Sequence, residues 1–290
     1  MNNPFISVII PVHNDSQRLK LCLDALQNQS YPRHLYEIIV VDNNSTESIK
    51  NLVEQLPNTV YAFEGKKGSY AARNTGIKTA QGEILAFTDS DCIPSNNWLE
   101  EGVKPIIDGK ADLVGGKINL FFRNKRSPVE LYDFVTFLNT ETSIKKGVCQ
   151  TANLFAPKNI FQKEGLFPCV ESGGDRQWTK NITSKNYRLL FSPAAIVKHP
   201  TRNFKGLIKK SYRIGKGVVP YYKNTEISKN KIISNTLKSF LPPKPKTLTT
   251  RINKRSVAIT RKLFIQMWIL AVISTIIKSF GIISTLFIRK

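Results

Sequence analysis

The most constraining feature of the chain is an alternation of short apolar runs and amphipathic segments in its first third. Each apolar run has the length and composition of a buried strand, and the segments that follow carry apolar residues at helical spacing. Such alternation over short connections predicts an α/β fold, a mostly parallel sheet flanked by helices. The expected strands are residues 7–10, 37–41, 60–63 and 84–87, and the expected helices are residues 19–26, 49–56 and about 70–80.

Two carboxylates stand just after the fourth apolar run. Asp89 and Asp91 follow residues 84–87 at the point where hydrophobicity ends. Acidic side chains at the carboxyl ends of parallel strands face a ligand crevice rather than a core. In a turn, both carboxylates can converge on one hard cation, which prefers oxygen ligands. The alternative is that the two residues only form Asx turns.

The first two strands end on the same rim of the predicted sheet, in residues 11–14 and in Asp42. The sequence contains no Gly-x-Gly-x-x-Gly after its first strand and no Gly-x-x-x-x-Gly-Lys-Ser/Thr. The two common glycine-rich ways of holding phosphates are therefore excluded. A phosphate-bearing ligand at this rim needs a metal ion instead.

This region holds four motifs in order: VIIPVHN at residues 8–14, VVDNNST at 40–46, ARNTG at 72–76 and GEILAFTDSD at 82–91. Together they resemble the successive N-terminal signatures of family 2 glycosyltransferases, and the resemblance continues more thinly to about residue 217. It implies a GT-A fold, a nucleotide-sugar donor with UDP as the default, and a divalent cation such as Mn²⁺ or Mg²⁺. It also implies transfer with inversion at the anomeric carbon.

The resemblance implies that Asp42 binds the nucleobase of the donor, because a carboxylate can accept a hydrogen bond from the imide N–H of uracil. Alternatively, Asp42 only caps the next helix. Lys67 and Arg73 can neutralise a diphosphate or buttress the acidic loop, but are otherwise ordinary solvated charges. The predicted nucleotide-sugar residues are Pro11, Val12, His13, Asn14, Asp42, Lys67, Arg73, Asp89 and Ser90.

The metal ligands also come from the resemblance. Asp91 matches the direct ligand, and Asp89 matches a residue near the ribose and the metal. His199, at the end of the last expected strand, matches a histidine that many relatives turn towards the metal or the diphosphate. Neutral imidazole suits manganese, although a lone histidine is more often structural. The predicted metal ligands are Asp89, Asp91 and His199.

A glycine-hinged loop at residues 171–178 is expected to open a helix and to supply the catalytic base. An inverting transfer needs a base for the acceptor hydroxyl, and Asp175 is the candidate. The family usually has two consecutive acids after the paired glycines, but here the second position is Arg176. Asp175 then acts as the base from a shifted position, or Glu171 takes this role. The remaining alternatives are that Asp175 only caps the helix or that the protein is inactive. Glu171, Arg176 and Trp178 are the predicted acceptor-binding residues, although Trp178 can instead pack in the core.

The net charge of +22 is concentrated in the C-terminal part of the chain. Residues 201–290 hold 20 of the 43 Lys and Arg residues and a single acid. Residues 204–216 predict a basic amphipathic helix of the kind that lies on anionic lipid. The proline-rich segment at 242–245 predicts a linker. Because the basic residues lie next to an apolar segment, a membrane surface is the expected partner and nucleic acid is not.

Residues 263–288 are predominantly apolar and hold a single charge, Lys278, with an expected break at Gly281. The segment is long enough to span a membrane. Two shorter interfacial helices, or a helix pair buried against the domain, are the alternatives. The sequence predicts three domains: a GT-A catalytic domain at 1–203, a basic helix and linker at 204–262, and a membrane-associating segment at 263–288. Within the catalytic domain, the nucleotide-sugar half is expected at about 1–93 and the acceptor half at about 94–203.

The four cysteines are far apart and follow no secretory signal, which predicts free thiols in a reducing compartment. The expected protein is therefore membrane-associated with a cytoplasmic catalytic domain. Its expected function is metal-dependent, inverting transfer of a sugar to a hydroxyl of a lipid-linked or surface-polysaccharide acceptor. The alternatives are a catalytically silent nucleotide-sugar-binding scaffold and, less favoured, a nucleic-acid binder.

Overall fold

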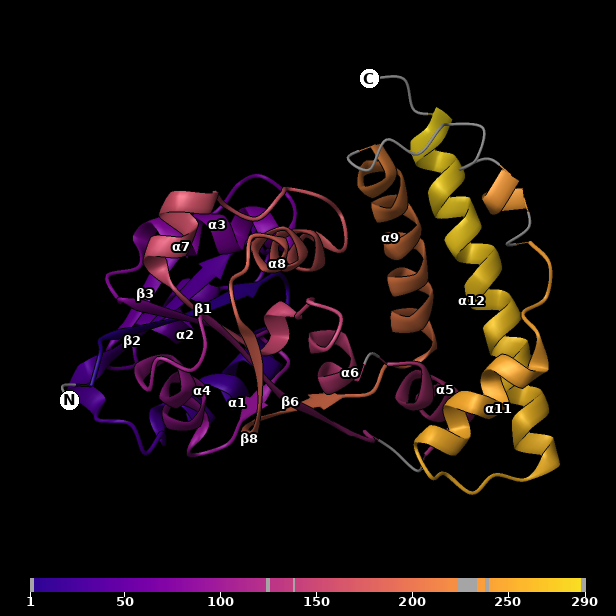
Figure 1. Ribbon diagram of the computed structural model, residues 1–290, viewed down its shortest axis with the longest axis horizontal. Coiled ribbons are helices and arrows are strands. Elements are labelled where there is room, and N and C mark those ends of the chain that lie inside the picture. Colours follow the sequence, from indigo (N-terminus) through magenta and orange to yellow (C-terminus); the bar gives the residue numbers. More distant parts are fainter. Residues whose placement is uncertain (1–2, 124–125, 138, 224–233, 238–239, 288–290) are drawn as a thin grey trace. The chain divides into compact units, whose positions relative to one another are not determined.

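A computed structural model describes residues 3–123, 126–137, 139–223, 234–237 and 240–287 (Figure 1). The chain divides into two compact units. The first unit comprises residues 1–119, 138–169 and 174–199, and the second unit comprises residues 120–137, 170–173 and 200–290.

An eight-stranded sheet has the strand order β3-β2-β1-β4-β7-β6-β8-β5. Its strands are β1 (Ile6–Val12), β2 (Tyr36–Asp42), β3 (Thr59–Phe63), β4 (Ile84–Phe87), β5 (Ile93–Pro94), β6 (Leu113–Phe121), β7 (Leu154–Pro157) and β8 (Leu189–Pro200). The pairs β3–β2, β2–β1 and β1–β4 are parallel, and β4–β7, β7–β6 and β8–β5 are antiparallel. The predicted α/β class is confirmed, with parallel pairing among the first four strands.

Helices pack on both faces of this sheet (Figure 1). Those of the first unit are α1 (Ser16–Gln27), α2 (Ile49–Glu54), α3 (Ser69–Thr79), α4 (Trp98–Ile107), α6 (Thr140–Ile144), α7 (Lys158–Glu164) and α8 (Gly174–Ser184), with short 3-10 turns at Arg33–Leu35 and Thr151–Asn153. Leu19 of α1 belongs to the same buried cluster as Val8 of β1. On the opposite face, a Cβ at Gly76 of α3 would lie 2.5 Å from Ile9 Cγ2. The glycine therefore lets α3 lie directly on the sheet.

Strand β1 extends further than its sequence predicts. The strand was expected to end at residue 10, but it continues for two residues, because Pro11 and Val12 are buried strand residues paired with Val41 and Asp42 of β2. Proline lacks the N–H that a strand between two neighbours must donate. Pairing of β1 with β4 ends at Ile9, so β1 has one paired neighbour at Pro11 and the proline is tolerated.

The second unit is helical. Its helices are α5 (Pro128–Thr136), α9 (Phe204–Lys223), α11 (Pro245–Lys254) and α12 (Arg261–Phe287). Helices α9 and α12 lie side by side (Figure 1). A Cβ at Gly281 would lie 2.3 Å from the carbonyl oxygen of Tyr212, and Ser211 Oγ lies 2.8 Å from Ser274 Oγ. The break predicted at Gly281 is wrong, because α12 continues through it and the glycine instead permits close helix packing.

The segment predicted as a linker contains helix α11. Pro245 lies in its first turn, where the missing N–H costs no helical hydrogen bond. Leu248 and Ile252 are buried in one cluster with Leu131 of α5 and Met267 of α12. This apolar packing explains why a polar, proline-flanked sequence is ordered as a helix.

Helix α12 has the length and composition of a membrane span. Among the described residues, 261–286 form the one helix that meets this description, with a mean hydropathy of 2.0 in its most apolar window and 28% of that window buried. Its large exposed apolar residues are Ile265, Ile269 and Phe280. One side of the helix therefore packs within the second unit, and another side presents apolar residues outwards.

Candidate active site

The predicted metal ligands meet at the carboxyl end of β4. One ligand atom from each of Asp89, Asp91, Cys92 and His199 lies within 4.8 Å of the others. Asp89 and Asp91 follow β4, and His199 is the penultimate residue of β8. His199 Nε2 lies 3.8 Å from Asp91 Oδ1. Residues more than a hundred positions apart in the chain thus form one cluster.

The donor set of this cluster fits a hard or borderline cation. Carboxylate oxygens suit both Mn²⁺ and Mg²⁺, and a neutral imidazole suits Mn²⁺. Cys92 is fully buried, and burial together with the charges of Asp89 and Asp91 holds the pKa of its thiol well above the ordinary value. The neutral thiol is a poor ligand for such a cation, so Asp89, Asp91 and His199 are the residues that fit it.

Two arginines hold the carboxylates in place. Arg73 of α3 is buried, and its Nη2 donates to Asp89 Oδ1. Arg18 of α1 donates from Nη1 to Asp91 Oδ2 at 3.3 Å. Each arginine occupies one carboxylate oxygen, which orients the aspartates and leaves Asp91 Oδ1 directed to His199.

Arg18 was not predicted as a site residue. It pairs with Asp15 through Nε at 2.6 Å, and Asp15 Oδ2 accepts a hydrogen bond from Ser90 Oγ at 3.1 Å. Asp15 makes no side-chain capping bond to α1, although its position is that of an N-cap. The pKa of Asp15 is raised, mainly because the carboxyl group is partly buried. The i,i+3 spacing of Asp15 and Arg18 was the available sequence signal.

The structure gives Asp42 internal partners. Its Oδ1 accepts from the Ser45 N–H at 2.9 Å, its Oδ2 accepts from the Tyr61 hydroxyl at 3.1 Å, and the residue is buried. The alternative that Asp42 caps the next helix is wrong, because helix α2 begins only at Ile49 and Asp42 instead closes a turn in the loop after β2. Each carboxylate oxygen can accept a second hydrogen bond. Asp42 therefore retains the capacity to accept the predicted hydrogen bond from the nucleobase of the donor.

The loops after β1 and β2 are tied together. His13 Nδ1 lies 2.9 Å from the Asn43 carbonyl oxygen. Asn14 adopts a positive φ of 50° and accepts the Thr46 N–H at 2.8 Å. The predicted residues His13 and Asn14 are exposed, whereas Pro11 and Val12 lie in the sheet.

Asn43, which sequence analysis did not single out, positions the loop that carries Lys67. Its side chain donates to the carbonyl oxygens of Glu64 and Lys66 at 2.9 and 2.8 Å and accepts the Gly68 N–H at 2.8 Å. Lys67 is exposed on this loop. Of the two predicted diphosphate cations, Lys67 is therefore accessible, and Arg73 is buried beneath Asp89.

Asp175 lies in the first turn of α8 and is buried. Its Oδ1 accepts from the Tyr70 hydroxyl and from the Arg176 N–H, both at 2.8 Å, and its Oδ2 accepts from the Thr151 N–H at 3.2 Å. Tyr70 and Arg73 stand one turn apart on α3. This helix therefore contacts both the candidate base and the acidic pair. Burial and the charge of Asp175 raise the pKa of Tyr70, which keeps its hydroxyl a donor.

The three predicted acceptor residues are placed differently. Arg176 is exposed on α8. Glu171 belongs to the second unit, where its Oε1 lies 2.5 Å from Lys216 Nζ. Trp178 is buried, stacks on Phe161 with ring centroids 4.2 Å apart, and donates to the carbonyl oxygen of Gly165 at 2.8 Å. This placement favours the core role that the sequence left open for Trp178.

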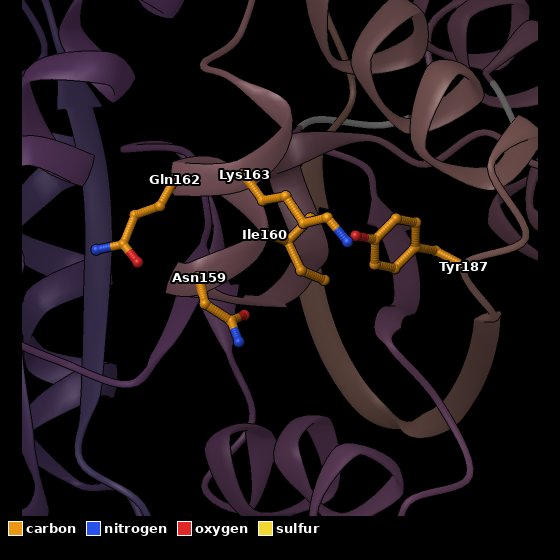
Figure 2. Close-up of a pocket in the computed structure, with 5 residues that line it drawn as sticks. All are labelled: Asn159, Ile160, Gln162, Lys163 and Tyr187. Carbon is orange, nitrogen blue, oxygen red and sulfur yellow. The ribbon is translucent and has the colours of Figure 1, made fainter.

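A separate pocket of about 500 Å³ lies beside α7 (Figure 2). The Lys163 amine and the Tyr187 hydroxyl point towards each other, with Lys163 Nζ 5.9 Å from the centroid of the tyrosine ring. None of its lining residues belongs to the predicted site. They are Asn159, Ile160, Gln162, Lys163 and Tyr187.

Comparison with known proteins reaches the same family as the four motifs. Residues 7–165 match the family model described as Glycosyl transferase family 2. The chain is 37% identical over 278 residues to "Glycosyltransferase AglE" of Haloferax volcanii, covering 92% of this chain and 91% of that relative. It is 27% identical over 237 residues to "Dolichyl N-acetyl-alpha-D-glucosaminyl phosphate 3-beta-D-2,3-diacetamido-2,3-dideoxy-beta-D-glucuronosyltransferase" of Methanococcus voltae, covering 74% of each chain.

Solved structures establish the fold. The mannosyltransferase PcManGT of Pyrobaculum calidifontis, solved with GDP-Man and Mn²⁺, superposes with a TM-score of 0.66 at 19% identity, covering 100% of this chain and 89% of that one. GalNAc-T7, solved with UDP, GalNAc and Mn²⁺, gives a TM-score of 0.57 at 19% identity, covering 69% and 44%. The mixed sheet with its flanking helices is thus a GT-A-like fold. The chain belongs to glycosyl transferase family 2 and is a glycosyltransferase.

Proposed function

We propose that this glycosyltransferase is metal-dependent and transfers a sugar, with inversion, from a nucleoside diphosphate sugar to a hydroxyl of a lipid-linked saccharide. UDP is the proposed nucleotide. The observation that carries the proposal is the cluster of Asp89, Asp91 and His199, whose ligand atoms lie within 4.8 Å of one another at the carboxyl end of β4.

The acidic pair and its arginines are proposed to bind the diphosphate end of the donor. Asp89, Asp91 and His199 would hold a divalent cation, which offsets the negative charge that develops on the departing nucleoside diphosphate. Lys67, exposed on the loop that Asn43 positions, is placed to add a positive charge. Arg73 would act by orienting Asp89.

Asp175 is the proposed base. Its Oδ1 already accepts two hydrogen bonds, whereas Oδ2 accepts one, from Thr151. Oδ2 therefore has the greater remaining capacity and is the atom proposed to take the acceptor's proton. Arg176, in place of a second acid, donates its backbone N–H to Asp175 rather than supplying a carboxylate.

The acceptor and the location are proposed from the second unit and from the relatives. The similarity to the Methanococcus voltae enzyme, whose name specifies a dolichyl phosphate-linked sugar, supports a lipid-linked acceptor. The apolar helix α12 and the basic helix α9 support membrane association, and the four free cysteines support the proposed cytoplasmic active site. The catalytic domain is proposed to be residues 1–203, with its donor half at about 1–93 and its acceptor half at about 94–203.

A nucleotide-release assay tests this function. The full chain in detergent would be screened with UDP- and GDP-linked sugars, Mn²⁺ or Mg²⁺, and dolichyl-phosphate-linked saccharides as acceptors. We expect release that requires both cation and acceptor and that is lost in Asp91→Asn and Asp175→Asn. Asp24→Asn, the same change at an exposed position on α1, is the matched control. Donor binding without transfer to any acceptor would instead support the non-catalytic scaffold.

A further inference from the structure

Gln150 carries a buried amide whose hydrogen-bonding groups are unused. The residue is 9% exposed. Neither its Oε1 nor its Nε2 is accessible to solvent, and neither has a hydrogen-bond partner among the residues that the structure describes. A buried amide without partners destabilises a fold, because it has lost water and gained nothing in exchange. A polar ligand that pairs with this amide would remove the cost.

The residues on either side of Gln150 locate it in the first unit. The Cys149 N–H donates to Thr179 Oγ1 of α8 at 3.0 Å, and the Thr151 N–H donates to Asp175 Oδ2 at 3.2 Å. The carbonyl oxygen of Ala152 accepts from Thr88 Oγ1 at 3.2 Å. The segment around Gln150 is thus bonded both to the helix that carries Asp175 and to the residue immediately before Asp89.

The chemistry of the amide selects the kind of ligand. Its NH₂ group needs an acceptor and its carbonyl oxygen needs a donor. A phosphate oxygen would satisfy only the NH₂ group and leave the carbonyl unpaired. Two neighbouring hydroxyls of a sugar ring, each able to donate and to accept, satisfy both groups at once.

In the proposed reaction, the transferred sugar must lie between the diphosphate near Asp89 and the base Asp175, and the segment around Gln150 is bonded at both places. We propose that Gln150 binds hydroxyl groups of the transferred sugar and so contributes to donor-sugar selection. The inference rests on the proposed function. The inference adds to that function the residue that distinguishes a nucleotide sugar from the bare nucleotide.

Calorimetry on the full chain in detergent with Mn²⁺ tests the inference. Wild type, Gln150→Leu and Gln150→Asn would be titrated with UDP, UDP-glucose and UDP-N-acetylglucosamine, and with GDP and GDP-mannose. We expect Gln150→Leu to weaken binding of the preferred nucleotide sugar about 10- to 100-fold and to leave binding of the bare nucleotide unchanged. Gln150→Asn keeps the amide on a shorter side chain, so its affinity for the nucleotide sugar should lie between those of wild type and Gln150→Leu.

The outcomes separate this inference from the proposed function. If wild type binds none of the nucleotides, the proposed function fails and the inference fails with it. If the nucleotide sugar and the bare nucleotide lose affinity equally, or neither changes, Gln150 has no contact with the sugar and its amide pairs with ordered water. In steady-state kinetics of the same variants, a rise in the acceptor KM alone would assign the amide to the acceptor and overturn the donor assignment. Thermal unfolding of both variants establishes that they fold, and Gln150→Leu should unfold at a higher temperature than wild type without ligand.

Discussion

The acidic pair of the first unit and a buried carboxylate of the second unit show how differently the same chemical group is used. Asp89 and Asp91 in the first unit have side chains that are 32% and 23% exposed, and each is held by one arginine. Asp133 in the second unit is 1% exposed and faces both Arg202 and Lys210, at 3.3 and 3.6 Å. One pair remains accessible beside an imidazole, and the other carboxylate is enclosed by cations.

The neighbouring Glu130 extends the contrast. It closes a capping box with Ser127 at the start of α5 and also accepts from the Arg123 N–H at 2.8 Å and from Thr201 Oγ1 at 3.0 Å. Its hydrogen bonds connect the start of α5 to the chain before α5 and to the chain before α9, so it stabilises the second unit. A buried, fully partnered carboxylate holds a fold together, whereas a half-exposed carboxylate with remaining lone pairs can bind a ligand.

The largest expected effect is the loss of activity on replacing Asp91. Asp91→Ala removes the carboxylate oxygen that faces His199 and should lower kcat/KM by about 10³-fold or more, because transition-state charge is no longer neutralised. Steady-state kinetics with saturating Mn²⁺ measure it, and Asp24→Ala is the control. The free energy of unfolding should change by less than about 1 kcal/mol, because only a partly exposed ion pair is lost. Activity near that of wild type would remove Asp91 from the metal site.

Asp133 should show the opposite pattern. Asp133→Ala leaves Arg202 and Lys210 facing each other without their carboxylate, and should destabilise the protein by about 3–5 kcal/mol. Chemical denaturation in detergent measures this loss. Asp112→Ala, which breaks an exposed pair with Arg188, should cost less than about 1 kcal/mol. Similar losses for the two variants would mean that the enclosed pair has no special structural role.

The periodic parts of the fold were predictable, because β1, β2, β4 and α1 are coded by local hydrophobic spacing. The exceptions arose where tertiary contacts override local signals. Pro11 continues a strand because its neighbour on one side is missing, and Gly281 continues a helix because α9 packs against it. Neither condition can be read from the adjacent residues.

The candidate site likewise contains residues that were predicted from the sequence and residues that were not. Asp89 and Asp91 follow a strand that the sequence identifies, whereas their grouping with His199 was predicted from the family resemblance. Arg18 and Tyr70 come from helices, and their side chains reach Asp91 and Asp175 across 73 and 105 residues of chain. Such pairs depend on how helices pack on the sheet, for which a single sequence contains no direct signal. Glu130 and Asp133 stood in a stretch without clear periodicity.

Lys210, which faces the buried Asp133, makes the stability of the protein depend on pH. Burial, together with the charge of Arg202, lowers the pKa of Lys210 to about 8 despite the opposing charge of Asp133. Between about pH 8 and the ordinary lysine value near 10.4, the unfolded chain holds this proton and the folded chain does not. Stability contributed by this group therefore rises with pH across that window.

The expected gain between pH 7 and pH 10 is about 1–3 kcal/mol, reduced from the full shift because the Lys210 side chain is 24% exposed. It is measured as the difference in unfolding free energy between wild type and Lys210→Met, since tyrosines common to both proteins then cancel. A difference that stays constant with pH would mean that Lys210 keeps its proton throughout, as a solvated surface lysine does.

The smallest expected effect concerns Tyr70, whose hydroxyl donates a hydrogen bond to the candidate base Asp175. Tyr70→Phe keeps the buried ring and removes only the hydrogen bond to Asp175 Oδ1, so the Arg176 and Thr151 N–H groups still orient the carboxylate. We expect kcat to fall about 3- to 10-fold, the effect of losing one ordinary hydrogen bond, with the donor KM unchanged. Steady-state kinetics at saturating acceptor measure both values. Tyr187→Phe, which removes a hydroxyl bonded to Glu164 beside α7, should leave kcat unaltered. If the two variants behave alike, the hydroxyl of Tyr70 serves packing alone, and Asp175 needs only its backbone donors to stay in position.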